Sequence, residues 1–190
     1  MNRTTTLLLG LSLCLAIAGC AEPPIPMQER VAVVTQDTRF DIAVPQSRVV
    51  LQVPRGDLHD VPQPEPRPTE NPHYFLLQGG GGLSISGWIE PARTFKPLPD
   101  VMAHEFAKFA TMGLGKPERV ETLRVGAFDA VAYDMTLADG VTGANVRASW
   151  HDQDTWIDVH LSRAGQSASA AQLRADVMAA LRGLVIQPKP

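Results

Sequence analysis

The segment from Ala127 to Ser162 constrains the fold most, because two turn motifs within it imply strand pairings that agree with each other. Asp139-Gly140 is a strong motif for a two-residue hairpin turn, and Gln153-Asp154 supplies a second turn. Both turns align the same alternate residues of the middle strand with apolar partners, namely Val146, Ala148 and Trp150. The segment is therefore predicted to form a three-stranded antiparallel meander with one apolar face.

The predicted register assigns a partner to each residue of that face. In the first hairpin the expected pairs are Tyr133 with Val146, Val131 with Ala148 and Asp129 with Trp150. In the second hairpin they are Trp150 with Ile157, Ala148 with Val159 and Val146 with Leu161. Residues 119–125 are predicted to add a fourth strand, which extends the meander over about residues 119–162.

A first amphipathic helix is predicted before the meander, over residues 101–112, with Asp100 as its N-cap. Glu105 and Lys108 fall on its solvent side. Its apolar stripe follows the helical period and consists of Met102, Phe106, Phe109 and Ala110. The helix is expected to pack this stripe on the sheet.

A second amphipathic helix is predicted after the meander, over residues 170–182, with Ser167 or Ser169 as its N-cap. Its stripe consists of Leu173, Val177, Leu181 and Leu184. Two amphipathic helices beside an antiparallel sheet define the α+β class, with each helix on a face of that one sheet.

Short apolar stretches before the first helix are predicted to be strands, over residues 31–35, 40–44, 48–53, 73–78 and 83–90. Six prolines between Pro54 and Pro72 exclude a helix or an inner strand there, so residues 54–72 are predicted to be an extended excursion. The four glycines 79–82 lack the Gly-Lys-Ser/Thr ending of a phosphate loop, and they are predicted to join two strands of a hairpin.

The N-terminus has the features of a bacterial secretory leader. Eleven apolar or small residues, Leu7–Ile17, are too few to span a hydrocarbon core of ~30 Å. The run ends in Ile17-Ala18-Gly19-Cys20, which resembles the lipobox of bacterial lipoproteins. The alternative is an ordinary secretory leader in which Cys20 is incidental.

The lipobox resemblance implies cleavage before Cys20 and acylation of that cysteine, so that residues 1–19 are a signal peptide. Acyl chains on Cys20 would anchor the protein in a membrane, because two or more chains bind a bilayer stably. Ala21 stands where an Asp would retain an enteric lipoprotein in the inner membrane, so the outer membrane is expected. Residues 20–30 are then a tether, and residues 31–187 a single α+β domain facing the periplasm.

The predicted order of elements in residues 31–187 resembles the PsbP-like fold of bacterial lipoproteins. That order is paired strands, a Gly-rich hairpin, a helix, a four-stranded meander and a C-terminal helix with an apolar end. The resemblance implies an adaptor or binding scaffold without common catalytic residues. The excursion at residues 54–72 fits this fold as an insertion.

Charge and residue composition argue against several kinds of partner and site. The chain has 17 basic and 20 acidic residues, a net charge of -3, which argues against a nucleic-acid partner. Cleavage would remove Cys14 and leave Cys20 as the only cysteine, so neither a disulfide nor a catalytic thiol is expected. His104-Glu105 begins like a zinc-protease motif, but Lys108 replaces the second histidine. No metal or cofactor is expected.

One polar face of the predicted meander contains candidate site residues, namely Arg147, His151, Asp158 and His160. These side chains suit a metal or anion site; the alternative, which we favour, is a polar face half covered by a helix or open to solvent. The function expected from the sequence is that of a non-enzymatic, lipid-anchored accessory protein with an envelope protein partner. Two alternatives remain: a carrier or sensor of a small apolar ligand beneath Met102, Phe106 and Phe109, and a hydrolase using His151, Asp158 and His160.

Overall fold

Two antiparallel sheets and two helices form the part of the chain that the computed structural model describes, residues 30–63, 73–136, 140–165 and 168–189. The predicted α+β class is confirmed. The large sheet has the strand order β4 (His59–Asp60), β5 (Tyr74–Gln78), β6 (Leu83–Pro91), β10 (Thr155–Gly165), β9 (Thr142–His151), β8 (Phe128–Thr136) and β7 (Glu118–Val125). The helices are α1 (Leu98–Thr111) and α2 (Ala170–Gly183).

A second, small sheet was not predicted from the sequence. Its strand order is β1 (Ala32–Thr35), β2 (Arg39–Ala43), β3 (Val49–Pro54) and β11 (Val185–Pro188). The last strand follows α2 directly and pairs antiparallel with β3, which lies more than a hundred residues earlier in the chain. Pairing between such distant segments leaves no local pattern in the sequence, so a single sheet was expected instead.

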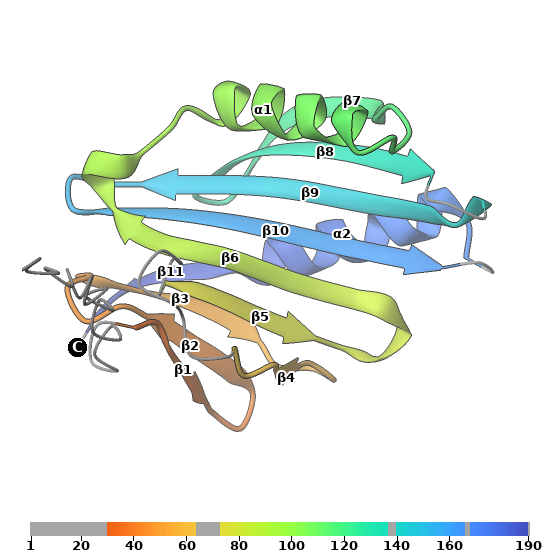
Figure 1. The fold of residues 1–190 in the computed structure, drawn as a ribbon. Coiled ribbons are helices and arrows are strands. Elements are labelled where there is room, and N and C mark those ends of the chain that lie inside the picture. The colour runs from red at the N-terminus through yellow and green to blue at the C-terminus, as the bar shows by residue number, and fades with distance from the viewer. Residues whose placement is uncertain (1–29, 64–72, 137–139, 166–167, 190) are drawn as a thin grey trace, which may run out of the picture.

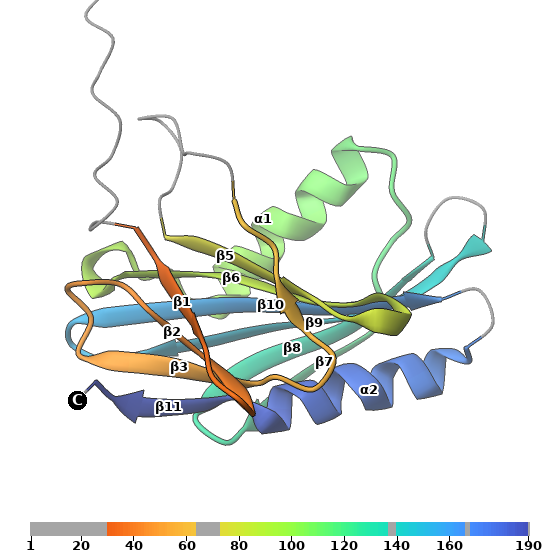
Figure 2. The same ribbon diagram turned by 90° about the horizontal axis from the view of Figure 1, so that it is seen from below.

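The two helices lie on opposite faces of the large sheet (Figures 1 and 2). Helix α2 and the small sheet share one face, where they bury the main hydrophobic core. Leu173, Val177 and Leu181 are the fully buried side chains of α2, as its predicted stripe requires. Helix α1 lies on the other face, over a smaller cluster of Leu98, Met102, Val131, Tyr133 and Met135.

The predicted register of the second hairpin is confirmed. Strand β9 pairs with β10 so that Trp150 lies opposite Ile157, Ala148 opposite Val159 and Val146 opposite Leu161. The turn between them is stabilised by Asp152, whose carboxylate accepts hydrogen bonds from the backbone N–H groups of Asp154 and Thr155 at 2.8 and 2.7 Å.

The predicted register of the first hairpin is wrong by one residue. Strand β8 pairs Tyr133 with Asn145 and Asp129 with Ser149, instead of with Val146 and Trp150. The last pair, Thr136 with Thr142, leaves residues 137–141 between the strands, an odd number that a two-residue turn does not allow. Asp139 of the predicted turn lies outside the described residues.

This shift turns over every side chain of β8, because a sheet alternates its faces with a period of two. Val131 and Tyr133 face α1 instead of the main core, and Ala130 and Ala132 take their place. Strand β8 is buried on both faces, so its apolar pattern does not distinguish the two registers.

The helix boundaries also differ in part from those predicted. Helix α1 begins at Leu98, after Pro97, and Asp100 lies in its first turn instead of capping it. Pro at the start of a helix is favourable because its missing N–H would have no partner there. Ser169 caps α2, as predicted, and its hydroxyl accepts a hydrogen bond from the N–H of Gln172 at 3.2 Å.

The Gly-rich turn and the first part of the Pro-rich segment both lie near the β4 end of the large sheet. Gly80–Gly82 form a short 3₁₀ turn between β5 and β6, which pair antiparallel, so the predicted hairpin is confirmed. Of the excursion at residues 54–72, the structure describes residues 54–63, which include the two-residue strand β4 at the edge of the sheet. Residues 64–72 lie outside the described part.

At Gly87 of β6 there is no room for a side chain. A Cβ atom there would lie 2.4 Å from the carbonyl oxygen of Asp158 and 3.1 Å from the ring of Phe75. The oxygen belongs to the neighbouring strand β10, so it cannot move without breaking the sheet pairing. We expect Gly87→Ala to lower the free energy of unfolding by about 1–3 kcal/mol, measured by urea denaturation.

Gly143→Ala is the matched control for Gly87→Ala. Gly143 is also a buried strand glycine, but a Cβ atom there has no neighbour closer than 3.8 Å. Equal losses of stability in the two variants would show that the close approach at Gly87 is not the cause.

Candidate functional site

The polar face of β9 and β10 lies beneath α1 and is built from residues of four elements. Strands β9 and β10 contribute Arg147, Asp158 and His160, three of the four predicted site residues. Helix α1 contributes Glu105, and β8 contributes Tyr133 through the shifted register. We call these five residues the polar cluster.

Arg147 is at the centre of the polar cluster. Its guanidinium donates two hydrogen bonds to Asp158, at 2.6 Å to Oδ1 and 2.5 Å to Oδ2, and a third to Glu105 at 3.4 Å. The side chains of Arg147 and Asp158 are only 11% and 7% exposed. The ring of Trp88 lies 5.3 Å from the guanidinium carbon, a cation–π distance. Arg147 is thus held by both charge and packing.

Glu105 joins α1 to the sheet, which corrects the prediction that it faces solvent. Its carboxylate accepts a 2.5 Å hydrogen bond from the hydroxyl of Tyr133 and lies 3.4 Å from Nη1 of Arg147. Burial and the adjacent Glu105 carboxylate both raise the pKa of Tyr133. Tyr133 is therefore protonated at neutral pH and donates its hydrogen bond to Glu105.

Burial also shifts the pKa values of the other cluster residues. It raises the pKa of Asp158, and the hydrogen bonds from Arg147 offset this effect in part. Burial works against the charge on Arg147, but Asp158 and Glu105 outweigh it and raise the pKa of the guanidinium. His160 has its pKa lowered to about 4, by burial and by the positive charge of Arg147, so its ring is neutral at pH 7.

The polar cluster ties α1 to the large sheet through Glu105. Four residues of the cluster are hydrogen-bonded to one another. The fifth, His160, has its Nε2 atom 3.2 Å from Oδ1 of Asn145, so every residue of the cluster has a hydrogen-bond partner. Hydrogen bonds between buried polar groups stabilise the fold, so these contacts hold the five side chains in place. In the described residues, no three His, Cys, Asp or Glu side chains are grouped to hold a metal ion.

His151, the fourth predicted residue of this face, lies apart from the polar cluster. It is exposed at the end of β9, where its ring stacks against Phe95 with the ring centres 4.0 Å apart. Asp158 is meanwhile engaged by Arg147. The structure therefore does not join His151, Asp158 and His160 in one site.

An apolar groove of about 700 Å³ lies between α1 and the strands β7 and β8. Proteins bind drug-sized ligands in clefts of about 300–1,000 Å³ with mainly apolar walls. The side chains that line this groove are mostly apolar: Phe95, Pro97, Leu98, Pro99, Met102, Phe106, Val120, Thr122, Leu123, Arg124, Asp129 and Val131. Val120 of β7 is 50% exposed at the rim of this groove.

The groove includes two of the three α1 residues beneath which the carrier hypothesis places a ligand. Met102 and Phe106 line it, as expected. Phe109 does not: it packs against Phe106 and Tyr133, with ring centres 6.2 Å apart in each case. The β7 and β8 side of the groove was missed, because the register error placed Val131 on the opposite face of the sheet.

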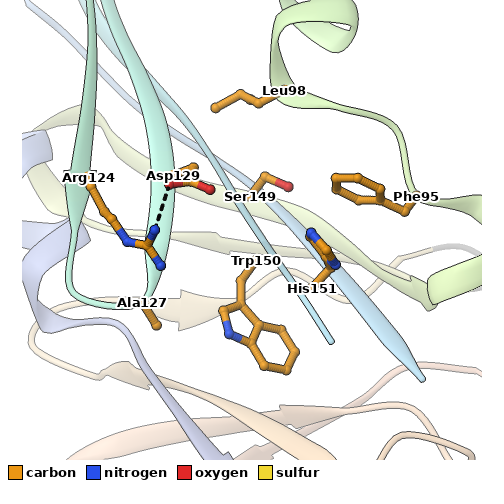
Figure 3. Close-up of a pocket in the computed structure, with 8 residues that line it drawn as sticks. All are labelled: Phe95, Leu98, Arg124, Ala127, Asp129, Ser149, Trp150 and His151. Carbon is orange, nitrogen blue, oxygen red and sulfur yellow. Dashed lines mark ion pairs between the residues drawn. The ribbon is translucent and has the colours of Figure 1, made fainter. Parts of the chain in front are cut away.

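A polar pocket of about 350 Å³ adjoins one end of the apolar groove. Figure 3 shows Arg124 of β7 and Asp129 of β8 facing each other at one side of it, with Ser149 and His151 on the neighbouring strand. Phe95, Leu98, Arg124 and Asp129 line both the pocket and the groove. The two cavities are therefore parts of one cleft with an apolar and a polar end.

A scan against models of protein families and a search of curated proteins found no match to this chain. None of the helices in the described residues has the length and apolar composition needed to cross a bilayer. Cys20, Ile17, Ala18 and Gly19 of the predicted lipobox lie outside those residues.

Proposed function

We propose that this protein is a lipid-anchored, non-enzymatic binding protein of the bacterial cell envelope, and that its ligand is a small apolar molecule held in the groove beneath α1. The observation that carries this proposal is the groove of about 700 Å³, open to solvent and lined by Met102, Phe106 and Val131. A tightly packed interface between α1 and the sheet would have left no such space. The lipobox sequence supports the anchored location.

The position of the groove suits an anchored binding protein. Strand β1, the first strand of the described part of the chain, and α1 lie at opposite sides of the molecule (Figure 1). If residues 20–30 are a tether, the tether joins the domain next to β1, on the side opposite the groove beneath α1. A groove in that position can exchange a ligand with the periplasm or with an envelope protein partner.

We also propose that residues 31–187 have the PsbP-like fold. It is supported by an antiparallel sheet with α1 on one face and α2 on the other, and by the order of these elements along the chain. A scaffold of that kind presents a binding surface without a catalytic centre.

A bulky residue in the groove is expected to block ligand binding. Thr122 is exposed on β7 and lines the groove, so Thr122→Trp would fill the space while keeping a residue that favours strands. With the neutral fluorescent probe N-phenyl-1-naphthylamine, we expect saturable binding to the wild type and about tenfold weaker binding to Thr122→Trp.

Thr35→Trp is the control for Thr122→Trp, because Thr35 is also an exposed strand threonine but lies on β1 in the small sheet. We expect it to bind the probe as the wild type does. Unchanged affinity in Thr122→Trp would show that the probe does not occupy the groove, and no binding to the wild type would contradict the proposed function.

The lipid anchor is tested by Cys20→Ser. Acylation requires the Cys20 thiol, so this variant is expected to lose all labelling by radioactive palmitate in growing cells. It should accumulate as an unprocessed or soluble form, as shown by fractionation and by its mass. Normal processing together with unchanged membrane retention would contradict the anchor.

A further inference from the structure

We propose that the ligand of this cleft is a single-chain amphiphile with an anionic headgroup, whose apolar chain lies in the groove while its headgroup is bound at Arg124 in the adjoining polar pocket. This inference rests on the proposed function, because it names the class of ligand for the same groove. It is carried by the chemistry of the polar pocket.

The shape of the cleft requires two chemically different parts in one ligand. The groove of about 700 Å³ has mainly apolar walls, and the pocket of about 350 Å³ contains Arg124, Asp129, Ser149 and His151. Because the cavities share four lining residues, a molecule in the groove reaches the pocket without crossing a barrier. A purely apolar ligand would leave the polar end filled with water.

Hydrogen-bond donors outnumber acceptors in the polar pocket. Arg124 has five N–H donors, Ser149 has a hydroxyl, and the His151 ring has at least one N–H. The hydroxyl oxygen of Ser149 already accepts a hydrogen bond from Trp156 at 3.0 Å, so its own proton remains to be donated. Asp129 is the one carboxylate lining the pocket. A ligand group that accepts hydrogen bonds fits this balance.

Arg124 is available to such a group. Its one ionic contact in the described residues is with Asp129, and the nitrogen and oxygen atoms are 3.6 Å apart, longer than a hydrogen bond (Figure 3). The two side chains are 71% and 65% exposed, so the pair contributes little to stability. An anionic headgroup can therefore take the donors of Arg124 without disturbing the fold.

The surroundings of Arg124 differ from those of the buried Arg147. The guanidinium of Arg147 is already shared between Asp158 and Glu105, and α1 covers it. Arg124 lies on the edge strand β7, where the pocket is open to solvent. Of the two, only Arg124 is placed to receive a charged group from outside.

The test compares three probes with the same twelve-carbon chain: dodecanoate, dodecanol and dodecyltrimethylammonium. Binding is measured by isothermal titration calorimetry on the full chain without its leader. The two ionic probes are kept below their critical micelle concentrations, and dodecanol is kept below its solubility limit. We expect the wild type to bind dodecanoate about tenfold more tightly than dodecanol, as a charge-assisted hydrogen bond predicts. The cationic probe should bind least tightly.

Two variants change the charge of the pocket in opposite directions. Arg124→Gln should abolish the preference for dodecanoate and leave the affinity for dodecanol unchanged. Asp129→Asn removes the repelling carboxylate and should make dodecanoate bind more tightly, again without an effect on dodecanol. A purely structural role for either residue would change the affinity for all three probes together. Arg48→Gln, at an exposed arginine outside the cleft, is the control.

The outcomes separate this inference from the proposed function. Equal binding of dodecanoate and dodecanol, or an unchanged preference in Arg124→Gln, would overturn the anionic headgroup while the groove stands as an apolar site. If none of the three probes binds, and N-phenyl-1-naphthylamine does not bind either, both proposals fail.

Discussion

Replacing Arg147 with alanine is expected to lower the free energy of unfolding by about 3–5 kcal/mol, because it leaves a buried carboxylate without its partner. Asp158 is only 7% exposed, and Arg147 donates two hydrogen bonds to it. Glu105 would lose its ion pair in the same variant and keep only the hydrogen bond from Tyr133. Urea denaturation followed by circular dichroism measures the loss.

Arg48→Ala is the matched control for this prediction. Arg48 also pairs with an aspartate, Asp154, at 3.2 Å, but its side chain is 82% exposed. Exposed pairs contribute little to stability, so this control should change the free energy of unfolding by less than about 1 kcal/mol. A loss in Arg147→Ala no larger than in Arg48→Ala would contradict the structural role of the cluster.

A double variant tests whether the loss of stability in Arg147→Ala comes from the unpaired charge on Asp158. Arg147→Met combined with Asp158→Leu removes both charges and keeps the volume, and such replacements of buried ion pairs are often neutral or stabilising. We expect the double variant to be more stable than Arg147→Ala alone. If it is less stable, the charges themselves stabilise the fold.

Acidification is expected to destabilise the protein through His160, by up to about 3 kcal/mol. The pKa of His160 is about 4 in the folded protein, against an ordinary value of 6.5. Above pH 6.5 the ring is neutral in both states, so it has no effect on stability. Between pH 6.5 and about 4 the unfolded chain takes up a proton that the folded protein does not, and stability falls as the pH falls.

The test compares wild type and His160→Gln in urea at pH 7 and pH 4.5. Asp158 and Asp60 have raised pKa values and act in the opposite direction, so the difference between the two proteins isolates the histidine. We expect the wild type to lose about 2–3 kcal/mol more than His160→Gln over this range. His104→Gln, at an exposed position on α1, should behave as the wild type does. Equal losses in wild type and His160→Gln would refute the prediction.

The polar cluster and the groove are connected through α1. Glu105 ties this helix to the sheet, and Met102 and Phe106 of the same helix line the groove. A change at Arg147 should therefore loosen the wall of the groove as well as the cluster. This is why the tests of ligand binding use Thr122, Arg124 and Asp129, which lie outside the cluster.

The amino-acid sequence by itself determined the local elements of this protein. Apolar residues at a helical period marked both helices, and the turn at Gln153-Asp154 specified the pairing of β9 with β10. That pairing places Arg147 and Asp158 on one face of the sheet, as predicted. Periodicity and turn chemistry are local properties, and they are visible without the fold.

Only the tertiary structure decided which face each helix covers, how β8 pairs, and where the cleft lies. Strand β8 is apolar on both faces, so its pattern allows two registers, and packing of Tyr133 beneath α1 distinguishes them. Glu105 looked like a solvent-facing residue because its partners are 28 and 42 residues away along the chain. The cleft is formed by α1, β7 and β8 together, and a space between elements exists only once those elements have packed.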